Sequence, residues 1–444
     1  MEGVLRGKYR RMMGRLIMNF KILLVSISRN RLSCRSRVML ICLILSDLPG
    51  LFSQGDPVYL ALNPSSQNVS LDSKNYCEIR NGLLNSYFSF THKKTGRVAF
   101  MGGSITQNAG WRDMICQYLK ERFPETKFEF INAGISSTGS TPGAFRFKSD
   151  VLDKGEIDLL FEEAAVNDRT NMFDSTACIR GIEGIVSHAR RANPFMDIVI
   201  MYFVDPDKMK DYNNGIIPYE IKAHDKVAEK YKIPSVNLAK EVTDRINNHE
   251  FTWEKDFVDL HPSDFGQKLY YNSIRILLES CWNQAEKKSE RVPYQLPEMI
   301  DKFSYINGEY VNINNAKPDH DWTFIENWSP ANSLVKHKMC VNVPVLFSGK
   351  PGAEFGLSFK GKAIGICAVT GPDAGIIKYS IDGKYSGTVD LYTQWSSQYD
   401  LPWFVIFEDE LSKSDHFLKL KISDKKNMQS EGNACYILKF LVNR

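Results

Sequence analysis

The sequence predicts a two-domain protein: an α/β domain built on a parallel sheet, followed by an all-β domain. Between residue 97 and about residue 282, short apolar strands alternate with helical stretches, which predicts a parallel sheet with helices on both faces. Beyond residue 300, short strands recur between turn residues without helical periodicity, which predicts a β-sandwich. The length of 444 residues suits two or three domains.

Apolar periodicity locates the elements of the α/β domain. Short apolar runs predict strands at residues 98–101, 128–131, 158–161, 198–203 and 233–237. Apolar residues spaced three or four apart predict helices at residues 111–123, 178–189 and 219–231. Ligands of such sheets bind at the carboxyl ends of the strands, so polar residues that follow strands are the candidates for a site.

The C-terminal part has a different pattern. Strands are predicted at residues 310–313, 341–345, 357–359, 363–367, 376–381 and 418–422. A charged stretch with two prolines predicts a linker before them. We therefore predict a leader over 1–55, a lead-in segment over 56–95, the α/β domain over 96–283, a linker over 284–300 and the β-sandwich over 301–444.

The first 55 residues predict an export signal. They carry ten basic and two acidic residues, a charge of +8, which leaves −4 for the rest of a chain whose net charge is +4. Arg35 and Arg37 precede an apolar run over 38–45, and a Pro-Gly pair and small residues follow. The run is too short to span a bilayer. We expect an exported protein, periplasmic or extracellular, without stable membrane insertion apart from the leader; a single membrane anchor is the alternative.

Charge and cysteine usage argue against a nucleic-acid-binding protein and against a zinc site. A mildly acidic body lacks the basic face that nucleic-acid binding needs. The seven cysteines beyond the leader are scattered, without a CxxC pair or a Cys/His cluster, so we expect mostly buried thiols. The sequence predicts no nucleic-acid partner, no metal and no cofactor, and it does not pair any disulfide.

Four polar blocks carry the candidate chemistry. They are GGSIT at 102–106, NAGIS at 132–136, AVND at 165–168 and DLHPS at 259–263. A serine at a strand-to-helix turn has an exposed hydroxyl, and neighbouring glycines permit the tight backbone. Acyl transfer needs such a nucleophile, a general base and preorganised N–H donors for the oxyanion.

In this order the blocks resemble those of SGNH (GDSL-like) hydrolases, over about residues 97–278. The resemblance implies a three-layer, flavodoxin-like SGNH fold and a serine esterase. It makes Ser104 the nucleophile, whose N–H also faces the oxyanion, and His261 the general base. Asn167 would donate its side-chain amide to the oxyanion. The usual Gly-Asp-Ser-Leu is Gly-Gly-Ser-Ile here, a variant common among carbohydrate esterases of this type.

Two positions depart from the family pattern. The oxyanion glycine falls on Ser137, whose N–H we expect to serve, with Gly134 as the alternative. The aspartate three residues before the histidine is Val258 here. We expect Asp259 to orient the imidazole, with Asp256 or a backbone carbonyl as alternatives.

Residues beside these blocks have further assignments. We expect Trp111 and Arg112 to bind substrate, with a structural role for the arginine as the alternative. Asp168 is expected to act as a helix N-cap or in a turn, and Glu163 to make a buried polar contact. His224 is expected on the surface of a helix.

The β-sandwich resembles jelly-roll modules of polysaccharide-active enzymes over residues 371–383. Its tryptophans either stack on sugars or belong to the core; they are Trp322, Trp328, Trp395 and Trp403. The whole sequence predicts a secreted serine esterase that removes O-acetyl groups from an acylated polysaccharide or oligosaccharide through an acyl-enzyme. The alternatives are a non-catalytic glycan-binding protein on the same scaffold, an acyltransferase or a lipase-like acylhydrolase.

Overall fold

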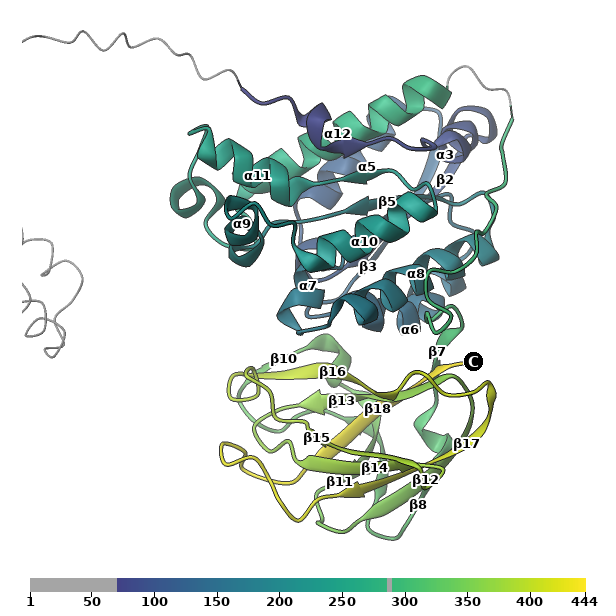
Figure 1. Ribbon diagram of the computed structural model, residues 1–444, viewed down its shortest axis with the longest axis vertical. Helices are drawn as coiled ribbons and strands as arrows, with labels where there is room; N and C mark the ends of the chain where they lie inside the picture. Colours follow the sequence, from purple (N-terminus) through teal and green to yellow (C-terminus); the bar gives the residue numbers. More distant parts are fainter. Residues whose placement is uncertain (1–69, 286–289) are drawn as a thin grey trace, which may run out of the picture. The chain divides into compact units, whose positions relative to one another are not determined.

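The computed structural model describes residues 70–285 and 290–444 (Figure 1). The predicted leader, residues 1–55, and the first part of the lead-in segment, residues 56–69, lie outside the described residues. One sheet flanked by helices is followed by two further sheets made of the C-terminal strands. The predicted fold class, α/β followed by all-β, is therefore confirmed.

A six-stranded sheet forms the centre of the α/β domain. Its order is β1-β6-β5-β4-β2-β3, and every pair except β1 with β6 is parallel. Counted from the first parallel strand, the order is 2-1-3-4-5, the flavodoxin-like arrangement whose switch point lies between β2 and β4. The strands are β1 (Cys77–Glu78), β2 (Thr95–Gly102), β3 (Lys127–Gly134), β4 (Leu159–Glu162), β5 (Asp197–Met201) and β6 (Ser235–Val236).

Helices cover both faces of this sheet (Figure 1). On one face α12 (Asp264–Ala285) packs on α5 (Trp111–Arg122) and α3 (Leu84–Phe88). On the other, α8 (Ser175–Ala192) packs between α6 (Ser140–Asp150) and α10 (Tyr219–Lys230). Because both faces are covered, β4 and β5 are buried along their whole length, which explains their continuous apolar sequences.

Four short helices begin where the parallel strands end. They are α4 (Ser104–Gln107), α7 (Ala165–Thr170), α9 (Pro206–Asn213) and α11 (Leu238–Asn247), after β2, β4, β5 and β6 respectively. Helix N-termini have unpaired N–H groups. This edge of the sheet therefore presents backbone donors beside the switch point.

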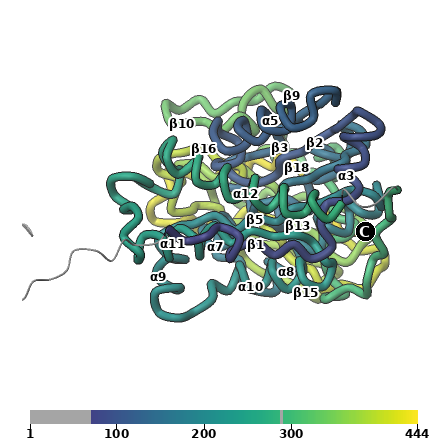
Figure 2. The backbone as a smooth tube through the Cα atoms, turned by 90° about the horizontal axis from the view of Figure 1, so that it is seen from above, coloured from purple at the N-terminus to yellow at the C-terminus, as the bar shows by residue number. Residues whose placement is uncertain are grey.

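The lead-in segment belongs to the α/β layers. β1 extends the sheet by pairing with β6. The turn η1 (Ser73–Tyr76) and β1 both contact α12, and Figure 2 shows this purple segment lying along the helix. The described part of the predicted lead-in segment is thus packed into the domain that we expected to begin at residue 96.

The C-terminal strands form two sheets that enclose a common apolar core. One sheet has the order β10-β16-β13-β18-β11-β9, with β7 also paired to β18, and the other is β15-β14-β17-β12-β8. Ile366 and Phe440 from the first meet Leu357 and Leu420 from the second in this core. The first sheet contains β7 (Gly308–Val311), β9 (Thr323–Trp328), β10 (Val335–Lys336), β11 (Val343–Ser348), β13 (Ala363–Thr370), β16 (Tyr399–Glu408) and β18 (Cys435–Asn443); the second contains β8 (Lys317–Pro318), β12 (Glu354–Gly361), β14 (Ile376–Ile381), β15 (Tyr385–Asp390) and β17 (Ser414–Ile422).

One strand shows how the β-sandwich joins the α/β domain. All eight residues of β13 are buried. Ile364 and Ile366 face the sandwich core, whereas Ala363 and Cys367 belong to the same apolar cluster as the α/β core. In agreement with this, α6 contacts β7 and β18. The two domains therefore share a core, and β13 has apolar residues on both faces.

Cysteines and tryptophans are largely interior. The seven cysteines of the described residues are free thiols, and five of them are buried, as expected. Trp322 is buried against Phe355, and Trp328 packs on Tyr436 with ring centroids 4.4 Å apart. Trp322 is therefore a core residue, and Trp328 is partly buried against the edge of the core. Over residues 70–285 and 290–444, no helix has the length and apolar content to cross a membrane.

Arg180 links α8 to the linker and the β-sandwich. Its guanidinium lies 2.9 Å from Asp301, 2.8 Å from Asp409 and 2.5 Å from Glu410, and its side chain is only 7% exposed. The hydroxyl of Tyr305 also donates to Asp409. One nearly buried cation thus balances three carboxylates from two segments.

We predict that Arg180→Ala lowers the free energy of unfolding by about 3 kcal/mol, because it leaves three carboxylates without their cation. Urea unfolding measures the change. Arg191→Ala on the same helix removes an exposed arginine that bonds to Ile306 and Asn307, and it should cost at most about 1 kcal/mol. Equal losses in the two variants would contradict the role assigned to Arg180.

Candidate active site

Ser104 lies at a tight turn between β2 and α4. Gly103 is the N-cap of α4, and Ser104 is its first residue. A Cβ on Gly102 would lie 2.5 Å from Thr106 Oγ1, and one on Gly103 would lie 1.9 Å from Asn167 Oδ1. Only glycine fits at either position, since real Cβ atoms do not approach so closely. The turn leaves Ser104 half-buried at the carboxyl edge of the sheet.

His261 reaches Ser104 from the loop before α12. Its Nε2 lies 2.7 Å from Ser104 Oγ, within the distance expected between a nucleophile and its general base. The histidine side chain is 48% exposed. In the neutral imidazole, Nε2 accepts the bond from the serine hydroxyl and Nδ1 carries the proton. The fold therefore brings together two predicted residues that are 157 positions apart.

The expected contact between Asp259 and the imidazole is not present. Asp259 Oδ1 lies 3.8 Å from His261 Nδ1, beyond hydrogen-bond distance, and accepts the backbone N–H of His261 at 2.5 Å instead. Asp256 accepts from the N–H and hydroxyl of Thr252. Within the described residues no group accepts from Nδ1. Asp259 therefore holds the loop rather than the ring, and Ser104 and His261 form a dyad.

Val258 occupies the position of the family's aspartate and has a strained backbone. Its φ is +81° and its ψ is −62°, a conformation that a β-branched residue rarely adopts. Its N–H donates to the carbonyl of Trp253 at 2.6 Å, and its side chain is exposed. This turn closes the π-helical segment η4 (Trp253–Phe257) and leads the chain to His261.

Ser137 has the backbone geometry of the glycine that it replaces. Its φ is +62°, in the left-handed region that glycine adopts most readily. Its carbonyl accepts from Asn171 Nδ2 at 3.0 Å, and the preceding N–H, of Ser136, donates to Gln107 Oε1 at 2.9 Å. Among the described residues the N–H of Ser137 has no acceptor. The loop is thus fixed by hydrogen bonds on both sides of the Ser137 N–H, which itself stays free to donate.

Gly134 has a packing role instead. Its N–H donates to Asn132 Oδ1 at 3.0 Å, so that donor is already used. A Cβ at this position would lie 2.4 Å from the backbone nitrogen of Gln107 in α4. The glycine lets β3 approach the helix that carries Ser104. Of the two predicted alternatives, the geometry favours Ser137.

Asn167 lies beside the turn of Ser104. It is in the first turn of α7 and only 9% exposed. The Cβ position of Gly103 is 1.9 Å from its amide oxygen and 3.7 Å from the carbonyl of Thr138. The amide of Asn167, the loop of Ser137 and the N-terminus of α4 therefore converge on one place, as an oxyanion site requires.

A buried carboxylate supports this arrangement. Asp168 accepts the N–H and the hydroxyl of Ser140, each at 2.7 Å, and Nε2–H of His224 at 2.8 Å. A Cβ on Gly139 would lie 2.1 Å from its Oδ1. Asp168 is thus a helix cap, as expected, but it caps the N-terminus of α6 rather than that of its own helix.

The expectation that His224 is a surface residue is wrong. Asp168 and His224 are both completely buried, because the carboxylate needs a donor inside the protein. Helical spacing alone did not distinguish this buried position from an exposed one. Through Asp168, His224 on α10 positions the start of α6 and the helix that carries Asn167.

Among the described residues, this cluster is the one group of side chains whose ligand atoms lie close enough together to hold a metal ion. Ligand atoms of Asp168, Cys178 and His224 lie within 4.8 Å of one another, and all three residues are buried. Carboxylate, thiolate and imidazole suit Zn²⁺. However, the carboxylate already accepts three hydrogen bonds, and burial raises the pKa of the Cys178 thiol. The contacts are those of a hydrogen-bonded cluster in which the Cys178 thiol keeps its proton.

Trp111 and Arg112 both make contacts within the protein. Trp111 is completely buried and packs against Phe100 and Phe203, so the expected substrate contact is wrong. Arg112 is 14% exposed; it donates to the carbonyl of Thr106 at 3.1 Å and pairs with Asp113. These contacts agree with the alternative structural role, since the guanidinium stabilises α4, the helix that begins at Ser104.

Glu163 makes the expected buried polar contact. Its Oε1 accepts the N–H of Val166 at 3.1 Å. Burial raises its pKa from 4.5 to about 7, although the nearby Lys208 acts in the opposite direction. The folded protein therefore holds a proton here that the unfolded chain loses at a lower pH.

We predict that Glu163→Gln flattens the dependence of stability on pH. The stability from this group is fully present below pH 4.5 and lost as pH rises through about 7, a change of about 3 kcal/mol. Urea unfolding of wild type and variant between pH 4.5 and 8 measures it. The pKa of Asp197 is also raised. Because Asp197 is present in both proteins, its contribution to the pH dependence cancels when the two profiles are compared. Parallel profiles would contradict the prediction.

We predict that His224→Leu costs about 3 kcal/mol of stability, because it leaves the buried Asp168 carboxylate without a donor. His224→Gln keeps an N–H donor and should retain most of that stability. Chemical unfolding at pH 7 compares the two. Losses of the same size would mean that the effect comes from packing rather than from the hydrogen bond.

Comparisons with known proteins agree with this geometry. Residues 100–269 match the model of the GDSL-like lipase/acylhydrolase family; this range holds Ser104, Asn167 and His261. No curated protein sequence matches the chain.

Two solved structures share the architecture of both domains. They are crystal structures of a two-domain esterase (CEX) active on acetylated mannans, one of them co-crystallised with mannopentaose. The mannopentaose structure has a TM-score of 0.67 and 20% sequence identity, and covers 84% of this chain and 97% of its own. The other has a TM-score of 0.62 and 19% identity, with coverage of 82% and 98%. At this identity the similarity shows the fold.

Proposed function

We propose that the protein is a serine esterase that removes O-acetyl groups from carbohydrate; residues 100–269 match the model of the GDSL-like lipase/acylhydrolase family. One observation carries the proposal: Ser104 Oγ and His261 Nε2 lie 2.7 Å apart at the switch point of a flavodoxin-like sheet. A nucleophile, a base and convergent N–H donors are the groups that ester hydrolysis needs.

In the first half-reaction, Ser104 Oγ attacks the acetyl carbonyl carbon while His261 Nε2 takes the hydroxyl proton. The carbonyl oxygen becomes an oxyanion, which the N–H groups of Ser104 and Ser137 and the amide of Asn167 stabilise. When the tetrahedral intermediate collapses, the C–O bond to the sugar breaks. His261 returns its proton to the sugar oxygen, and the acetyl group remains on Ser104.

In the second half-reaction, water replaces the sugar. His261 Nε2 takes a proton from water as its oxygen attacks the acetyl carbon, and the same donors hold the new oxyanion. Acetate leaves, and the proton returns to Ser104 Oγ. Because His261 is 48% exposed, water has direct access to the base. Such access favours hydrolysis over acyl transfer to a second sugar.

The substrate class rests on the two-domain architecture. The two-domain esterase of similar fold is active on acetylated mannans, and its structure covers 84% of this chain, more than the α/β domain alone. The N-terminal segment, basic and then apolar, has the pattern of an export signal. An exported enzyme would meet polysaccharides outside the cytoplasm. We therefore propose an exported enzyme acting on acetylated polysaccharide or oligosaccharide.

The decisive experiment is acetate release from acetylated mannan and acetylated xylo-oligosaccharides. We expect Ser104→Ala and His261→Ala each to lower kcat by roughly 10³-fold or more, since a nucleophile and its base act as a unit. Ser136→Ala is the matched control: this serine is in the neighbouring loop, and its hydroxyl bonds to Gln107. It should stay within about tenfold of wild type.

Three outcomes would contradict the proposal. Wild type that binds acetylated glycan but releases no acetate would identify a non-catalytic glycan-binding protein. Release that survives in Ser104→Ala would place the chemistry elsewhere. Acetylation of an added acceptor sugar in place of acetate release would identify an acyltransferase.

We predict that Asp259→Asn lowers kcat by less than about tenfold, because the carboxylate lies 3.8 Å from Nδ1 and is 64% exposed. An orienting aspartate in a serine triad contributes roughly 10⁴-fold. Steady-state kinetics beside Asp256→Asn, which loses only a loop contact, compares the two. A loss of several thousandfold would show that Asp259 turns onto the ring when substrate binds.

A further inference from the structure

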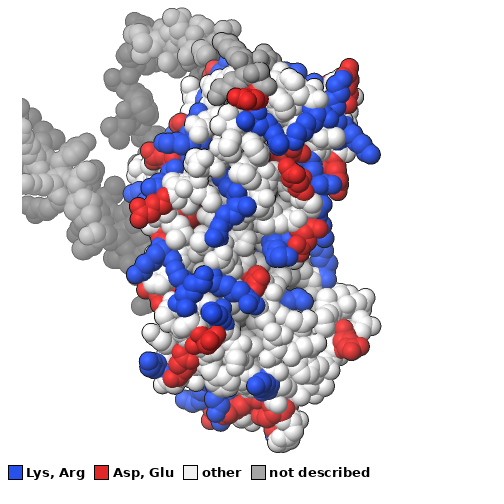
Figure 3. Space-filling view, turned by 90° about the vertical axis from the view of Figure 1, so that its right-hand side faces the viewer, with Lys and Arg blue, Asp and Glu red and all other residues white. Residues whose placement is uncertain are grey.

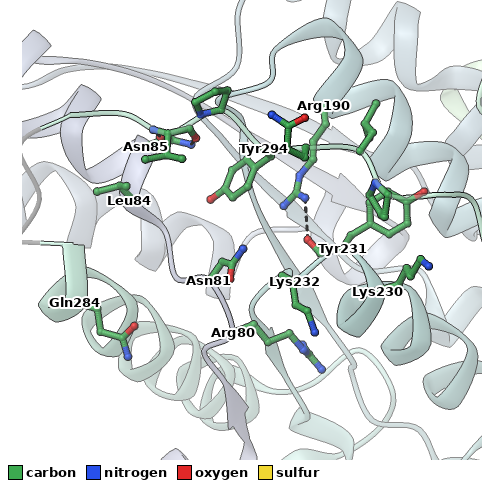
Figure 4. A pocket seen from close by; sticks show the side chains of 15 residues that line it. Arg80, Asn81, Leu84, Asn85, Arg190, Lys230, Tyr231, Lys232, Gln284 and Tyr294 are labelled. Atoms are coloured by element: carbon green, nitrogen blue, oxygen red, sulfur yellow. Dashed lines mark hydrogen bonds between the residues drawn. The ribbon is translucent and has the colours of Figure 1, made fainter.

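A cavity of about 600 Å³ lies at the edge of the sheet opposite Ser104 (Figure 4). Its walls come from the last turns of α8, α10 and α12, from the start of α3 and the segment before it, and from linker residues 292–297. α8 and α10 precede β5 and β6, so the cavity faces the amino ends of these strands. Its volume is in the range of small-molecule sites.

The lining carries basic but no acidic side chains. Arg80 is neutralised by Asp225 at 2.8 Å. Lys230 and Lys232 have no ion-pair partner among the described residues, and both are exposed. Figure 3 shows basic side chains next to acidic ones over parts of the face that it draws, but the lining of the cavity itself includes no acidic side chain to balance its positive charge.

Arg190 projects into this cavity with unused donors (Figure 4). It is 4% exposed; its Nη1 donates to the carbonyl of Tyr231 at 2.8 Å, and its Cζ lies 3.9 Å from the ring centroid of Tyr294. Its Nε is buried and has no acceptor. The nearest carboxylate behind it, Asp197, is held by Ser86 and Tyr294. Nη2 makes no hydrogen bond with any described residue, and leaving such donors of a nearly buried guanidinium unpaired is costly.

Helix ends account for only part of this arrangement. Basic residues in the last turns of α8 and α10 are favourable because these ends are partly negative. That explains Lys230 and the bond from Arg190 to Tyr231. It does not explain why the remaining donors of this nearly buried guanidinium, Nη2 among them, have no acceptor in the protein next to an open cavity. An oxyanion would supply the missing acceptors, and a planar guanidinium binds carboxylate or phosphate with two bonds.

We propose that this cavity binds a sugar-sized oxyanion, with Arg190, Lys230 and Lys232 holding its charged group. The remaining lining suits a polyhydroxylated body, since the amides of Asn81 and Gln284 donate and accept hydrogen bonds. The anionic group is the carboxylate of an acidic sugar or the phosphate of a sugar phosphate. The site is distinct from Ser104 and does not depend on ester hydrolysis.

The test is titration of the full-length protein at pH 7.5 and constant ionic strength, by calorimetry and by thermal unfolding. The probes are glucuronate, glucose 1-phosphate, inorganic phosphate and neutral glucose. At least one sugar anion should bind and raise Tm. Lys230→Gln/Lys232→Gln should weaken it about tenfold or more. Lys222→Gln/Lys226→Gln removes two exposed charges from the same helix outside the cavity and should leave the affinity unchanged.

Arg190→Lys keeps the charge but loses the planar fork, and it should also weaken binding in a protein shown by its unfolding curve to be folded. Binding of glucuronate alone identifies an acidic sugar, and binding of glucose 1-phosphate alone identifies a sugar phosphate. The proposal is overturned if no anion binds, if glucose binds equally, or if both lysine pairs have the same effect. Ser104→Ala should bind the anion with the affinity of wild type. A failure of the esterase proposal would therefore leave this binding result unchanged.

Discussion

The buried carboxylate of Asp168 is the interaction on which the site depends. A charge completely removed from water must be surrounded by donors, and its donors come from Ser140 at the start of α6 and from His224 on α10. Two helices, α6 and α10, are thereby tied to α7 at Asp168, the residue next to Asn167. The glycines beside the site allow this closeness, since any Cβ on Gly103 or Gly139 would collide with Asn167 or Asp168.

The nucleophile and its base are supported to different degrees. Ser104 is held by the glycine turn, by the bracing guanidinium of Arg112 and by the packing of β3 against α4. His261 is on an exposed loop, entered through the strained Val258 and held by Asp259 through its backbone N–H. Ser104 and the proposed oxyanion donors are therefore held by several contacts, whereas the imidazole is oriented mainly by its bond to Ser104. A preorganised oxyanion site is the larger contribution in acyl transfer.

The β-sandwich is joined to the hydrolase domain by apolar packing and by charge. β13 is buried on both faces, so the C-terminal sheets have one core of their own and one shared with α6. Arg180 adds three carboxylate contacts to this junction. The linker also walls the basic cavity at the opposite edge of the sheet from Ser104. The linker region thus has two structural roles: it contributes Asp301 to the ion pairs of Arg180, and its residues 292–297 form one wall of the basic cavity.

Local patterns in the sequence determined the fold class, most central strands and the residues of the dyad. Apolar runs such as 98–101 and 376–381 form strands because burial of apolar side chains is a property of short segments. Polar blocks after strands meet because parallel strands end at one edge. By contrast, the helix over 140–150 was missed, since Pro142 and Gly143 weaken its helical pattern. The burial of Trp111 and His224, the position of Asp259 and the lining of the basic cavity were decided by tertiary structure. Each depends on contacts between residues far apart in the chain, and no local pattern records those contacts.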